Sequence, residues 1–524
     1  MKKVIILDGY TDEPAGLGVP PFIDVYPRYI AGAIWSSSPD TKVIYYTIDE
    51  ARKNFSSFYS EASTSEITVV IAGVVVPGKY IGGRPITPEE VKSIGMVLNN
   101  TFTVLVGPAA RFGMGEEGGK PAISPSSFKN FYGAVVSGDP EIYISEVMKL
   151  GVEKVDVWVK RKSYDEVNRF ATVGAKIVRQ HPNYAYNLTA EIETYRGCSR
   201  WIVGGCSFCI EPLYGKPVVR PPEKVIEEVR ALYSEGIRSF RIGRQPDILS
   251  YGSTDLGVKE NPEPNPEFLD YFFKGLREAA GNSNIHVDNA NPSVISSYPE
   301  KSKKAILSIM KYHSPGDVLA FGVESADEEV VEMNNLNVTF EDAVKAVEVV
   351  NEVGRAVGEN GLPHILPGIN FVLGLPGERA KTYERNLEFL DELLRRKLMV
   401  RRINIRRVLV IPGTRLHSMW KESILSKNEE RARRFIWLVR HKYDPAFLRM
   451  VVPPGAILRN LYVERSESWG NTYARQLGSY PIMVELRGRF NPPCILDAKI
   501  VGYKGRSLKG VPVSQCRTSE ISPP

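Results

Sequence analysis

Long apolar runs are missing from this sequence of 524 residues. None approaches the roughly 18 residues that a membrane-spanning helix needs, so we expect no transmembrane segment. Lys2 and Lys3 precede an apolar run at 4–7, which is too short for a secretion signal and is typical of a first β-strand. We therefore expect a soluble, cytoplasmic protein.

Cysteine and histidine are also scarce, at five and six residues. No histidine precedes His181, which excludes a histidine-ligated cofactor within the first 180 residues. Three of the five cysteines, Cys198, Cys206 and Cys209, are nevertheless gathered within twelve residues. Three thiolates this close in sequence can converge on one metal centre, and three protein ligands leave a cubane iron–sulfur cluster with one iron open to an exchangeable ligand.

A structural zinc site and a disulfide are the alternatives for these three cysteines. Zinc needs a fourth protein ligand, and the candidates are His181, seventeen residues upstream, and Cys494 and Cys516, nearly 300 residues downstream. Three clustered cysteines cannot all pair with one another, and disulfides are rare in the cytoplasm. For Cys494 and Cys516 we expect separate buried thiols rather than a disulfide.

Acidic residues are few near the C-terminus. Residues 395–524 hold 26 Lys and Arg against 9 Asp and Glu, which is a net charge of +17. Because the whole chain has a net charge of +6, residues 1–394 have a net charge of −11. A basic excess of this size attracts polyanions by counterion release, and the usual partner is RNA or DNA. A solvated surface with interspersed charge is the alternative.

Residues 1–150 alternate short β-branched runs with loops and helix-like stretches. This pattern predicts an open parallel sheet with helices on both faces, which is a Rossmann-like α/β domain. The predicted strands are 4–7, 43–46, 67–76, 102–106 and 133–136, with a helix at 88–99.

Residues 185–412 repeat a strand and a helix. Six such units predict a partial (β/α)6 barrel, whose site lies at the carboxyl ends of the strands. The predicted strands are 191–194, 239–242, 285–287, 319–323, 369–373 and 403–410, and the predicted helices are 222–236, 266–281, 299–313, 340–358 and 381–397. The cysteine loop directly follows the first strand, at the end of the barrel where sites form.

The cysteine loop resembles the motif of the radical S-adenosylmethionine (SAM) superfamily. Arg196-Gly197-Cys198 matches the common lead-in, and Phe208-Cys209 matches the aromatic residue before the last cysteine. The first cysteine spacing is seven residues where three is usual, and Gly204-Gly205 can fold the longer loop back. The resemblance implies a [4Fe-4S] cluster that binds SAM at its open iron. Its implied ligands are Cys198, Cys206 and Cys209.

Segments after the second and fourth strands also resemble SAM-binding segments of the superfamily. Gly243, Arg244 and Gln245 follow the second strand, where the family holds the methionyl amine, although the usual glutamate is missing here. Glu324 and Ser325 end the fourth strand in a Gly-Xaa-Glu-Ser sequence close to that of methylthiotransferases and coproporphyrinogen dehydrogenases. The resemblance implies that these residues bind SAM.

The fifth strand leads into Gly-Leu-Pro-Gly-Glu, which is close to the family's turn near the adenine. By this resemblance Asn370, Gly374 and Pro376 bind SAM, together with Phe208 of the cysteine loop. A strand-to-helix turn with a glutamate at the helix N-terminus explains the same residues without a ligand.

Two other strand ends indicate a substrate. Asp288 and Asn289 close the third strand, and alternation along the sixth directs Arg402 and Arg406 to the barrel interior. Buried charges need an anionic or polar partner, which is the SAM carboxylate, a substrate phosphate, or an internal ion pair with Asp288 or Glu324. We take Asp288, Asn289, Arg402 and Arg406 as candidate catalytic residues.

The basic end of the chain divides into two predicted parts. Residues 413–475 form a basic helical segment, with Arg431, Arg433, Arg434 and Arg440 followed by Tyr462, Trp469 and Tyr473. Arginines with interleaved aromatics suit unstacked RNA bases, and equally suit a surface helix packed on the core. Residues 477–524 resemble TRAM, the small tRNA-binding β-barrel of methylthiotransferases, by their short alternating runs and the basic segment 503–510.

The N-terminal domain resembles the cobalamin-binding-type domain that precedes many radical SAM cores. The resemblance rests on the segments 18–21 and 26–32. The domain has no histidine to coordinate cobalamin and no cysteine to hold the second cluster found in methylthiotransferases. We expect a structural role, with cobalamin binding restricted to a mode without a histidine ligand.

These resemblances together imply an enzyme that reductively cleaves SAM to a 5′-deoxyadenosyl radical. They also imply an electron donor such as ferredoxin or flavodoxin. The expected substrate is tRNA or another RNA. A small molecule of cofactor biosynthesis is the second candidate, and a metal-stabilised RNA-binding protein without catalysis is the third.

Overall fold

The N-terminal sheet of the computed structural model is parallel and has the strand order β3-β1-β4-β5-β6. The structure describes residues 2–11, 18–74, 82–421, 423–467 and 470–518. The strands are β1 (Lys3–Asp8), β3 (Lys42–Thr47), β4 (Ile67–Ile71), β5 (Phe102–Val106) and β6 (Ala134–Val135). The predicted strand at 67–76 thus ends at Ile71, and its residues 75 and 76 lie outside the described ranges.

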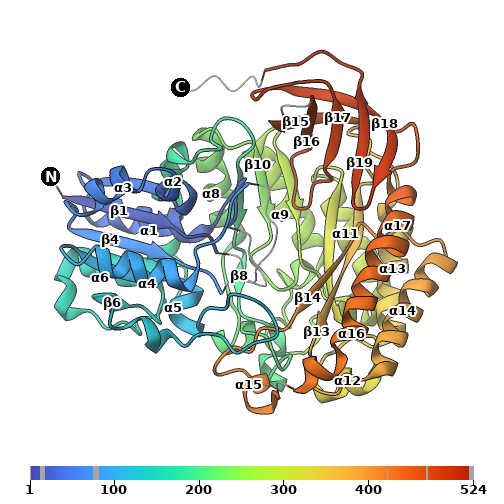
Figure 1. Cartoon of the computed structure of the whole chain (residues 1–524), viewed down its shortest axis with the longest axis horizontal. Helices are drawn as coiled ribbons and strands as arrows, with labels where there is room; N and C mark the ends of the chain where they lie inside the picture. The colour runs from blue at the N-terminus through green and yellow to red at the C-terminus, as the bar shows by residue number, and fades with distance from the viewer. Residues whose placement is uncertain (1, 12–17, 75–81, 422, 468–469, 519–524) are drawn as a thin grey trace.

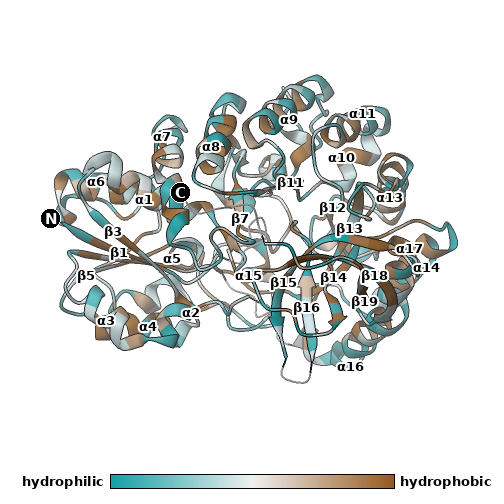
Figure 2. Cartoon of the chain, turned by 90° about the horizontal axis from the view of Figure 1, so that it is seen from above, coloured by the Kyte–Doolittle hydropathy of each residue, from teal (hydrophilic) through white to brown (hydrophobic). Residues whose placement is uncertain are grey.

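Helices cover both faces of this sheet, as Figure 2 shows. Alternate residues of β1 enter different cores: Val4 and Ile6 pack toward the first helix, whereas Ile5 and Leu7 pack into the core of the opposite face. The helices are α1 (Val25–Ser37), α2 (Ile48–Lys53), α3 (Phe55–Ala62), α4 (Pro88–Val97), α5 (Pro108–Phe112), α6 (Pro140–Leu150) and α7 (Asp165–Val173). The predicted Rossmann-like domain is confirmed.

The central part of the chain is a partial parallel barrel. Its two sheets have the orders β11-β10-β7-β2 and β12-β13-β14, and Ala290 N donates to Ala320 O where they meet. The strands are β2 (Phe22–Ile23), β7 (Thr189–Ile192), β10 (Ser239–Ile242), β11 (Asn284–Val287), β12 (Asp317–Glu324), β13 (Ile365–Leu373) and β14 (Arg402–Arg407). The barrel helices are α8 (Pro222–Ser234), α9 (Pro266–Ala280), α10 (Pro292–Ser297), α11 (Pro299–Met310), α12 (Glu328–Met333), α13 (Phe340–Gly354) and α14 (Ala380–Arg395). The predicted barrel of six strand–helix units is confirmed.

The N-terminal part is joined to the barrel by a strand and by a buried ion network. Strand β2 pairs with β7, so the segment after β1 extends the barrel sheet. Arg28 of α1 and Arg220 both bind the carboxylate of Glu228 on α8, and all three side chains are fully buried. Apolar residues of α1 belong to the same core as those of the barrel helices. These contacts set the position of the two parts relative to each other.

The chain after β14 forms helices and then a closed five-stranded barrel, which Figure 1 shows in red. The elements are α15 (Arg415–Met419), α16 (Ser423–Leu438), a π-helical turn (Val439–Tyr443), α17 (Asp444–Val451), β15 (Ile457–Ser466), β16 (Asn471–Arg475), β17 (Val484–Arg487), β18 (Ile495–Lys504) and β19 (Ser507–Pro512). The barrel order is β15-β16-β17-β19-β18, and β17 with β19 is its parallel pair. This topology is that of an OB-type Greek-key barrel.

The expectation of separate thiols at Cys494 and Cys516 is wrong, because the two residues form a disulfide. Ile495 and Arg517 exchange two backbone hydrogen bonds. This pairing places their neighbours 494 and 516 side by side, with Cα atoms 5.3 Å apart. The two cysteines are 22 positions apart in sequence, so no local pattern predicts that they pair.

The described ranges contain no helix that is both long and apolar enough to cross a membrane.

Candidate functional site

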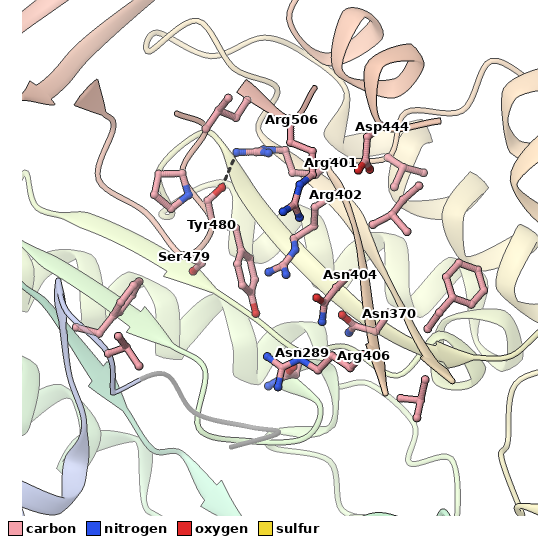
Figure 3. Close-up of a pocket in the computed structure, with 18 of the residues that line it drawn as sticks. Asn289, Asn370, Arg401, Arg402, Asn404, Arg406, Asp444, Ser479, Tyr480 and Arg506 are labelled. Atoms are coloured by element: carbon pink, nitrogen blue, oxygen red, sulfur yellow. Dashed lines mark hydrogen bonds between the residues drawn. The ribbon is translucent and has the colours of Figure 1, made fainter. Parts of the chain in front are cut away.

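A cavity of about 620 Å³ lies where the three parts of the chain meet. Phe208 and Glu324 line it at the carboxyl ends of the barrel strands, and Arg402 lines it at the amino end of β14. The N-terminal segment contributes residues 19–22, and the C-terminal barrel contributes 479–483. Figure 3 shows the polar residues of this wall pointing toward one another.

The cysteine loop lies next to the Glu324 end of the cavity. Residues 199–203 form a 3-10 turn, and Gly204 and Gly205 follow with φ of 81° and 65°, a region that glycine adopts at little cost. The Cys198 Sγ accepts a hydrogen bond from Arg200 N at 3.4 Å, and Arg200 Nη1 donates to Cys206 Sγ at 3.1 Å. One arginine therefore links the first and second cysteines of the loop.

Two asparagines after α12 hold the widened loop in place. Ser207 donates from Oγ to Asn334 Oδ1 at 2.8 Å, and its backbone N donates to Asn334 O. Asn335 Nδ2 donates to the carbonyl oxygens of Val203 and Gly205 at 2.9 and 2.8 Å. These anchors were not predicted, since they come from a segment more than 120 residues downstream of the loop.

The three thiols are buried and influence one another. Burial raises the pKa of Cys198 to about 12 and raises the pKa values of Cys206 and Cys209, and the nearby thiols raise the pKa values of Cys198 and Cys209 further. Ionising all three therefore requires a cationic centre between them. Such a centre is what a cluster with three thiolate ligands supplies.

Zinc fits these thiols poorly. Among the described residues, no three His, Cys, Asp or Glu side chains are close enough to hold one metal ion. Each cysteine that holds a cubane binds a different iron, so a cluster suits thiols that are too far apart to share one metal ion. Cys494 and Cys516 are bonded to each other, and His181 is buried against Tyr45 in the N-terminal part. Each of the fourth ligands considered for zinc is thus committed elsewhere.

Glu324 presents a carboxylate at the cysteine end of the cavity. Its backbone has a φ of 62°, and the register of β12 shifts at this point. Its Oε2 is buried and has no hydrogen-bond partner among the described groups. Burial raises the pKa of Glu324 to about 8, against the lowering effect of Arg406. A buried carboxylate oxygen without a donor fits a ligand that brings an ammonium or hydroxyl group.

Five of the predicted site residues other than the cysteines line the cavity together with Glu324. They are Phe208, Asn289, Asn370, Arg402 and Arg406. The wall formed by the described residues does not include Gly243, Arg244, Gln245, Ser325, Gly374 or Pro376.

Internal contacts explain why the second-strand residues lie behind the wall. The amide of Gln245 accepts from Thr194 Oγ1 and donates to Ile242 O. Arg244 extends toward Asp24 at the start of α1, with 3.5 Å between Nη1 and Oδ2. The side chains of both residues are therefore occupied by packing between the barrel and its neighbours.

Local contacts also account for the residues near the fourth and fifth strand ends. Ser325 Oγ accepts from Asp327 N at the start of α12. The backbone nitrogens of Gly374 and Leu375 donate to Glu378 Oε1, and Pro376 O accepts from Asn334 Nδ2. The turn interpretation of this segment thus has hydrogen bonds of its own, and Pro376 links the turn to the residue that anchors the cysteine loop.

Asp288 forms the internal ion pair, but with Arg241 and not with Arg402 or Arg406. It also accepts a hydrogen bond from Tyr480 Oη at 2.6 Å. The guanidinium of Arg402 instead lies over the Tyr480 ring, 3.8 Å from its centroid. Asp288 therefore positions Tyr480, which in turn covers Arg402.

Tyr480 belongs to a loop that the sequence did not indicate as part of the site. Ser479 N donates to His286 Nδ1 at 3.0 Å, and Ser479 Oγ donates to Val287 O at 2.8 Å. Gly478 passes so close to the His286 ring that a Cβ would lie 2.6 Å from it. The loop is thereby fixed to the barrel strand β11. It has no periodic pattern and no motif, so no signal in the sequence marked it.

Three arginines, Arg401, Arg402 and Arg506, form what we call the arginine cluster at the amino end of β14. No described carboxylate forms an ion pair with any of them, and the lining residue Asp444 pairs with Arg440 at 2.7 Å. Burial lowers the pKa of Arg401 to about 9 and that of Arg402 as well, and the positive charge of Arg402 lowers the pKa of both neighbours. The cluster is therefore suited to an anionic ligand.

The predicted basic helix contributes little to the cavity. Arg440 donates to Ile403 O and pairs with Asp444, whereas Arg433 pairs with Glu429 on the surface. Tyr462 packs edge-on against Tyr186. Trp469 lies outside the described residues.

Comparison with known proteins agrees with this geometry. Residues 192–390 match the model of the radical SAM superfamily. An uncharacterised protein of Methanocaldococcus jannaschii is 43% identical over 526 residues, which are 99% of this chain and 95% of that protein. The tRNA-2-methylthio-N(6)-dimethylallyladenosine synthase of Clostridium novyi is 23% identical over 252 residues, which are 48% of this chain and 47% of that enzyme.

A solved structure shares the fold. The radical S-adenosylmethionine methyltransferase TsrM from Kitasatospora setae superposes with a TM-score of 0.52 at 14% identity, covering 89% of this chain and 79% of TsrM. A likeness at this identity concerns the fold alone. Together, the matched family model, the barrel and its cysteine loop show that the chain belongs to the radical SAM superfamily of enzymes, whose cofactors are a [4Fe-4S] cluster and SAM.

Proposed function

We propose that this enzyme modifies RNA by radical chemistry in the cavity between its three parts. Cys198, Cys206 and Cys209 hold the cluster in this proposal, and SAM lies between the cysteine loop and Glu324. When bound, these cofactors supply a 5′-deoxyadenosyl radical that takes a hydrogen atom from the substrate. The unpartnered Oε2 of Glu324 accepts a hydrogen bond from SAM, and Phe208 and Asn370 shape the wall beside it.

The observation that carries the RNA proposal is the arginine cluster at the end of the cavity away from the cysteines. Arg401 and Arg402 come from the start of β14, and Arg506 comes from the loop between β18 and β19 of the OB-type barrel. That loop is one of those with which OB-type barrels bind oligonucleotides. A nucleotide extruded from an RNA strand can thus place its phosphate at the arginine cluster while the OB-type barrel holds the flanking RNA strand.

Charge and relatedness support the same substrate. The region from residue 395 onward has a net charge of +17. The Clostridium novyi relative is named as a tRNA-2-methylthio-N(6)-dimethylallyladenosine synthase, so a distantly similar enzyme modifies a tRNA base. A TRAM-like role for the C-terminal barrel is part of this proposal.

A small anionic molecule is the second candidate. The arginine cluster can hold a single phosphate or carboxylate without any RNA chain, and the cavity of about 620 Å³ is large enough for a small-molecule site. The two candidates differ in salt dependence and in their need for the outer face of the C-terminal barrel.

Histidine-ligated cobalamin does not fit the N-terminal domain. The first histidine of the chain is His181, which is buried, lies against Tyr45 and accepts a hydrogen bond at Nδ1 from Asn183 N. TsrM has also been solved with cobalamin and a [4Fe-4S] cluster bound. We assign no step to cobalamin in this enzyme.

The arginine cluster provides a direct test of the substrate. Replacing Arg402 with Gln removes a charge-assisted contact worth about 1.5–3 kcal/mol, so we expect RNA modification to fall by roughly 10- to 100-fold. Cleavage of SAM without substrate should change little, because Glu324 and Phe208 of the cysteine loop lie at the other end of the cavity. The two rates are measured by mass spectrometry of nucleosides and by 5′-deoxyadenosine formation.

Arg84→Gln is the matched control for this variant. The Arg84 side chain is 69% exposed in the N-terminal domain, and its substitution makes the same charge change outside the cavity. Equal losses of RNA modification in the two variants would contradict the proposed role of the arginine cluster. Deletion of residues 477–524 is a poorer test, since it would also remove Tyr480 from Asp288.

RNA affinity should depend steeply on salt. Each phosphate neutralised on a single strand contributes a slope of about −0.7 to log K against log salt, so several contacts should give a slope of several units. The measurement is fluorescence anisotropy of a labelled tRNA at 50–400 mM salt, on the order of the range that resolves such slopes. A flat response would favour the small anionic molecule.

A further inference from the structure

We propose that the loop between Cys198 and Cys206 is the docking surface for the protein that reduces the cluster, a small acidic one-electron carrier. The proposal rests on the function proposed above. Each reductive cleavage passes one electron through the cluster to the sulfonium of SAM, which yields methionine and the deoxyadenosyl radical. A new electron must therefore reach the cluster from a donor for every SAM cleaved.

The loop and its neighbours expose an apolar surface that we call the cluster-loop patch. It consists of Trp201, Ile202, Val203, Leu213 and Val258, whose exposed fractions are 38%, 42%, 42%, 40% and 63%. Trp201 Nε1 donates to Gly257 O at 3.2 Å, which places the indole beside Val258. Exposed apolar groups that are contiguous on a surface indicate an interaction site.

The backbone of the patch is fixed before any partner arrives. Asn335 Nδ2 holds the carbonyls of Val203 and Gly205, and Ser199 Oγ accepts from Gly257 N at 3.1 Å. The five apolar side chains on this base leave apolar surface that the fold does not cover. They suit a small, pre-formed and transient interface, the type that electron-carrier proteins use.

The patch lies beside the cysteines proposed to hold the iron–sulfur cluster and does not line the cavity. Three of its members lie between two of the proposed ligands, Cys198 and Cys206, in the widened part of the loop. None of its five residues lines the described cavity. A protein docked on the patch can thus approach the cluster while substrate occupies the cavity.

Positive charge at the edge of the patch selects an acidic partner. Lys216 and Arg415 are both exposed, and no described carboxylate pairs with either. Lys216 lies next to Gly257, and Arg415 Cδ lies 3.9 Å from the Cβ position of Gly204.

Two acidic groups near the patch have basic partners of their own. Glu260 is paired with Arg200 at 2.8 Å, and Asp255 is paired with Lys259 at 2.8 Å. An apolar centre with a basic edge complements an electron carrier that has an apolar contact area and acidic surroundings. RNA would instead require stacking groups amid a continuous basic surface, so we place RNA at the C-terminal barrel.

The test compares two reductants on one variant. In Trp201→Glu, SAM cleavage driven by a reduced low-potential ferredoxin should fall about tenfold or more through a higher KM for ferredoxin. Cleavage driven by dithionite should be unchanged, because a small chemical reductant needs no docking surface. Trp437→Glu is the matched control, since that tryptophan is 57% exposed on α16 and lies outside the patch.

The outcomes separate this proposal from the one on which it rests. Absence of dithionite-driven cleavage in the unaltered enzyme would reject the proposed function itself. Full ferredoxin-driven activity in Trp201→Glu, with dithionite-driven cleavage intact, would reject the docking surface. If Trp201→Glu lost activity with both reductants, the double variant Lys216→Glu, Arg415→Glu would decide, because it keeps the apolar packing of the loop. An unchanged KM for ferredoxin in that variant would also overturn the proposal.

Discussion

Replacing Cys206 with Ala should abolish both the iron–sulfur cluster and SAM cleavage. Three thiolates leave one iron of the cubane open, whereas two would leave two irons without a protein ligand, so the variant should not hold the cluster. The unaltered protein should carry about four irons per chain after anaerobic reconstitution, and the variant should fall to background. The effect is measured by iron and sulfide analysis, by the visible sulfur-to-iron charge-transfer absorbance and by 5′-deoxyadenosine formation.

Cys516→Ala is the control for the loss of a cysteine as such. Cys516 is exposed and bonded to Cys494 in the C-terminal part of the chain, and neither residue lines the cavity. Its removal should leave iron content and SAM cleavage intact. Tightly bound zinc with no iron in the unaltered protein would contradict the cluster assignment.

The regular parts of the fold could be predicted from local sequence patterns. The strand at 239–242 and the helix starts at Pro222, Pro266, Pro299 and Phe340 agree with the structure to the residue. Helical spacing of apolar residues with proline at the first turn marks such elements without help from the rest of the chain. Strand ends were less accurate, because β13 begins at Ile365 and β14 ends at Arg407 where tertiary pairing decides.

The site could be predicted only where one segment carries the information. The cysteines, Phe208 and Glu324 stand in recognisable local sequences, and Arg402 with Arg406 follow from strand alternation. Arg244 shows the limit of this approach. Its position after β10 was predicted, but its side chain extends to Asp24, which lies 220 residues earlier in the sequence.

The C-terminal part shows a second limit. Its charge indicated a separate RNA-binding module, whereas the structure places Tyr480 and Arg506 in the wall of the cavity. Net charge reports what a region attracts and says nothing of where the region docks. The contacts of Ser479 with His286 and Val287 decide that position, and they join a loop to the strand β11 about 190 residues earlier in the sequence.

The largest expected effect on stability comes from Glu228, because its carboxylate is shared by two buried arginines. Arg220 Nη1 lies 2.6 Å from Glu228 Oε2, and Arg28 pairs with Oε1. In Glu228→Gln both guanidiniums keep some hydrogen bonds, Arg28 to Glu191 O and Arg220 to Glu193 O, but lose their counter-charge in a region with no exposure. Breaking a buried ion pair in this way costs about 3–5 kcal/mol.

The neighbouring residue Glu227 provides a control on the same helix. Its side chain is 44% exposed and pairs with Lys224, so Glu227→Gln should cost at most about 0.5 kcal/mol. Urea denaturation monitored by circular dichroism, together with hydrogen exchange of α1 and α8, measures both variants. The exchange data should show faster opening of both helices in Glu228→Gln, since the network joins them. Equal effects of the two substitutions would mean that the network contributes little.

A triple variant separates the cost of unpaired charge from the loss of packing. Replacing Arg28, Arg220 and Glu228 together with Met, Met and Leu leaves no buried charge and keeps similar volumes, so much of the lost stability should return. If the triple variant is instead as unstable as Glu228→Gln, its own loss comes from the arginine hydrogen bonds to backbone carbonyls, which the triple variant removes and Glu228→Gln keeps. Those bonds then set how the N-terminal part is joined to the barrel, and through β2 they also set the position of the residues 19–22 that line the cavity.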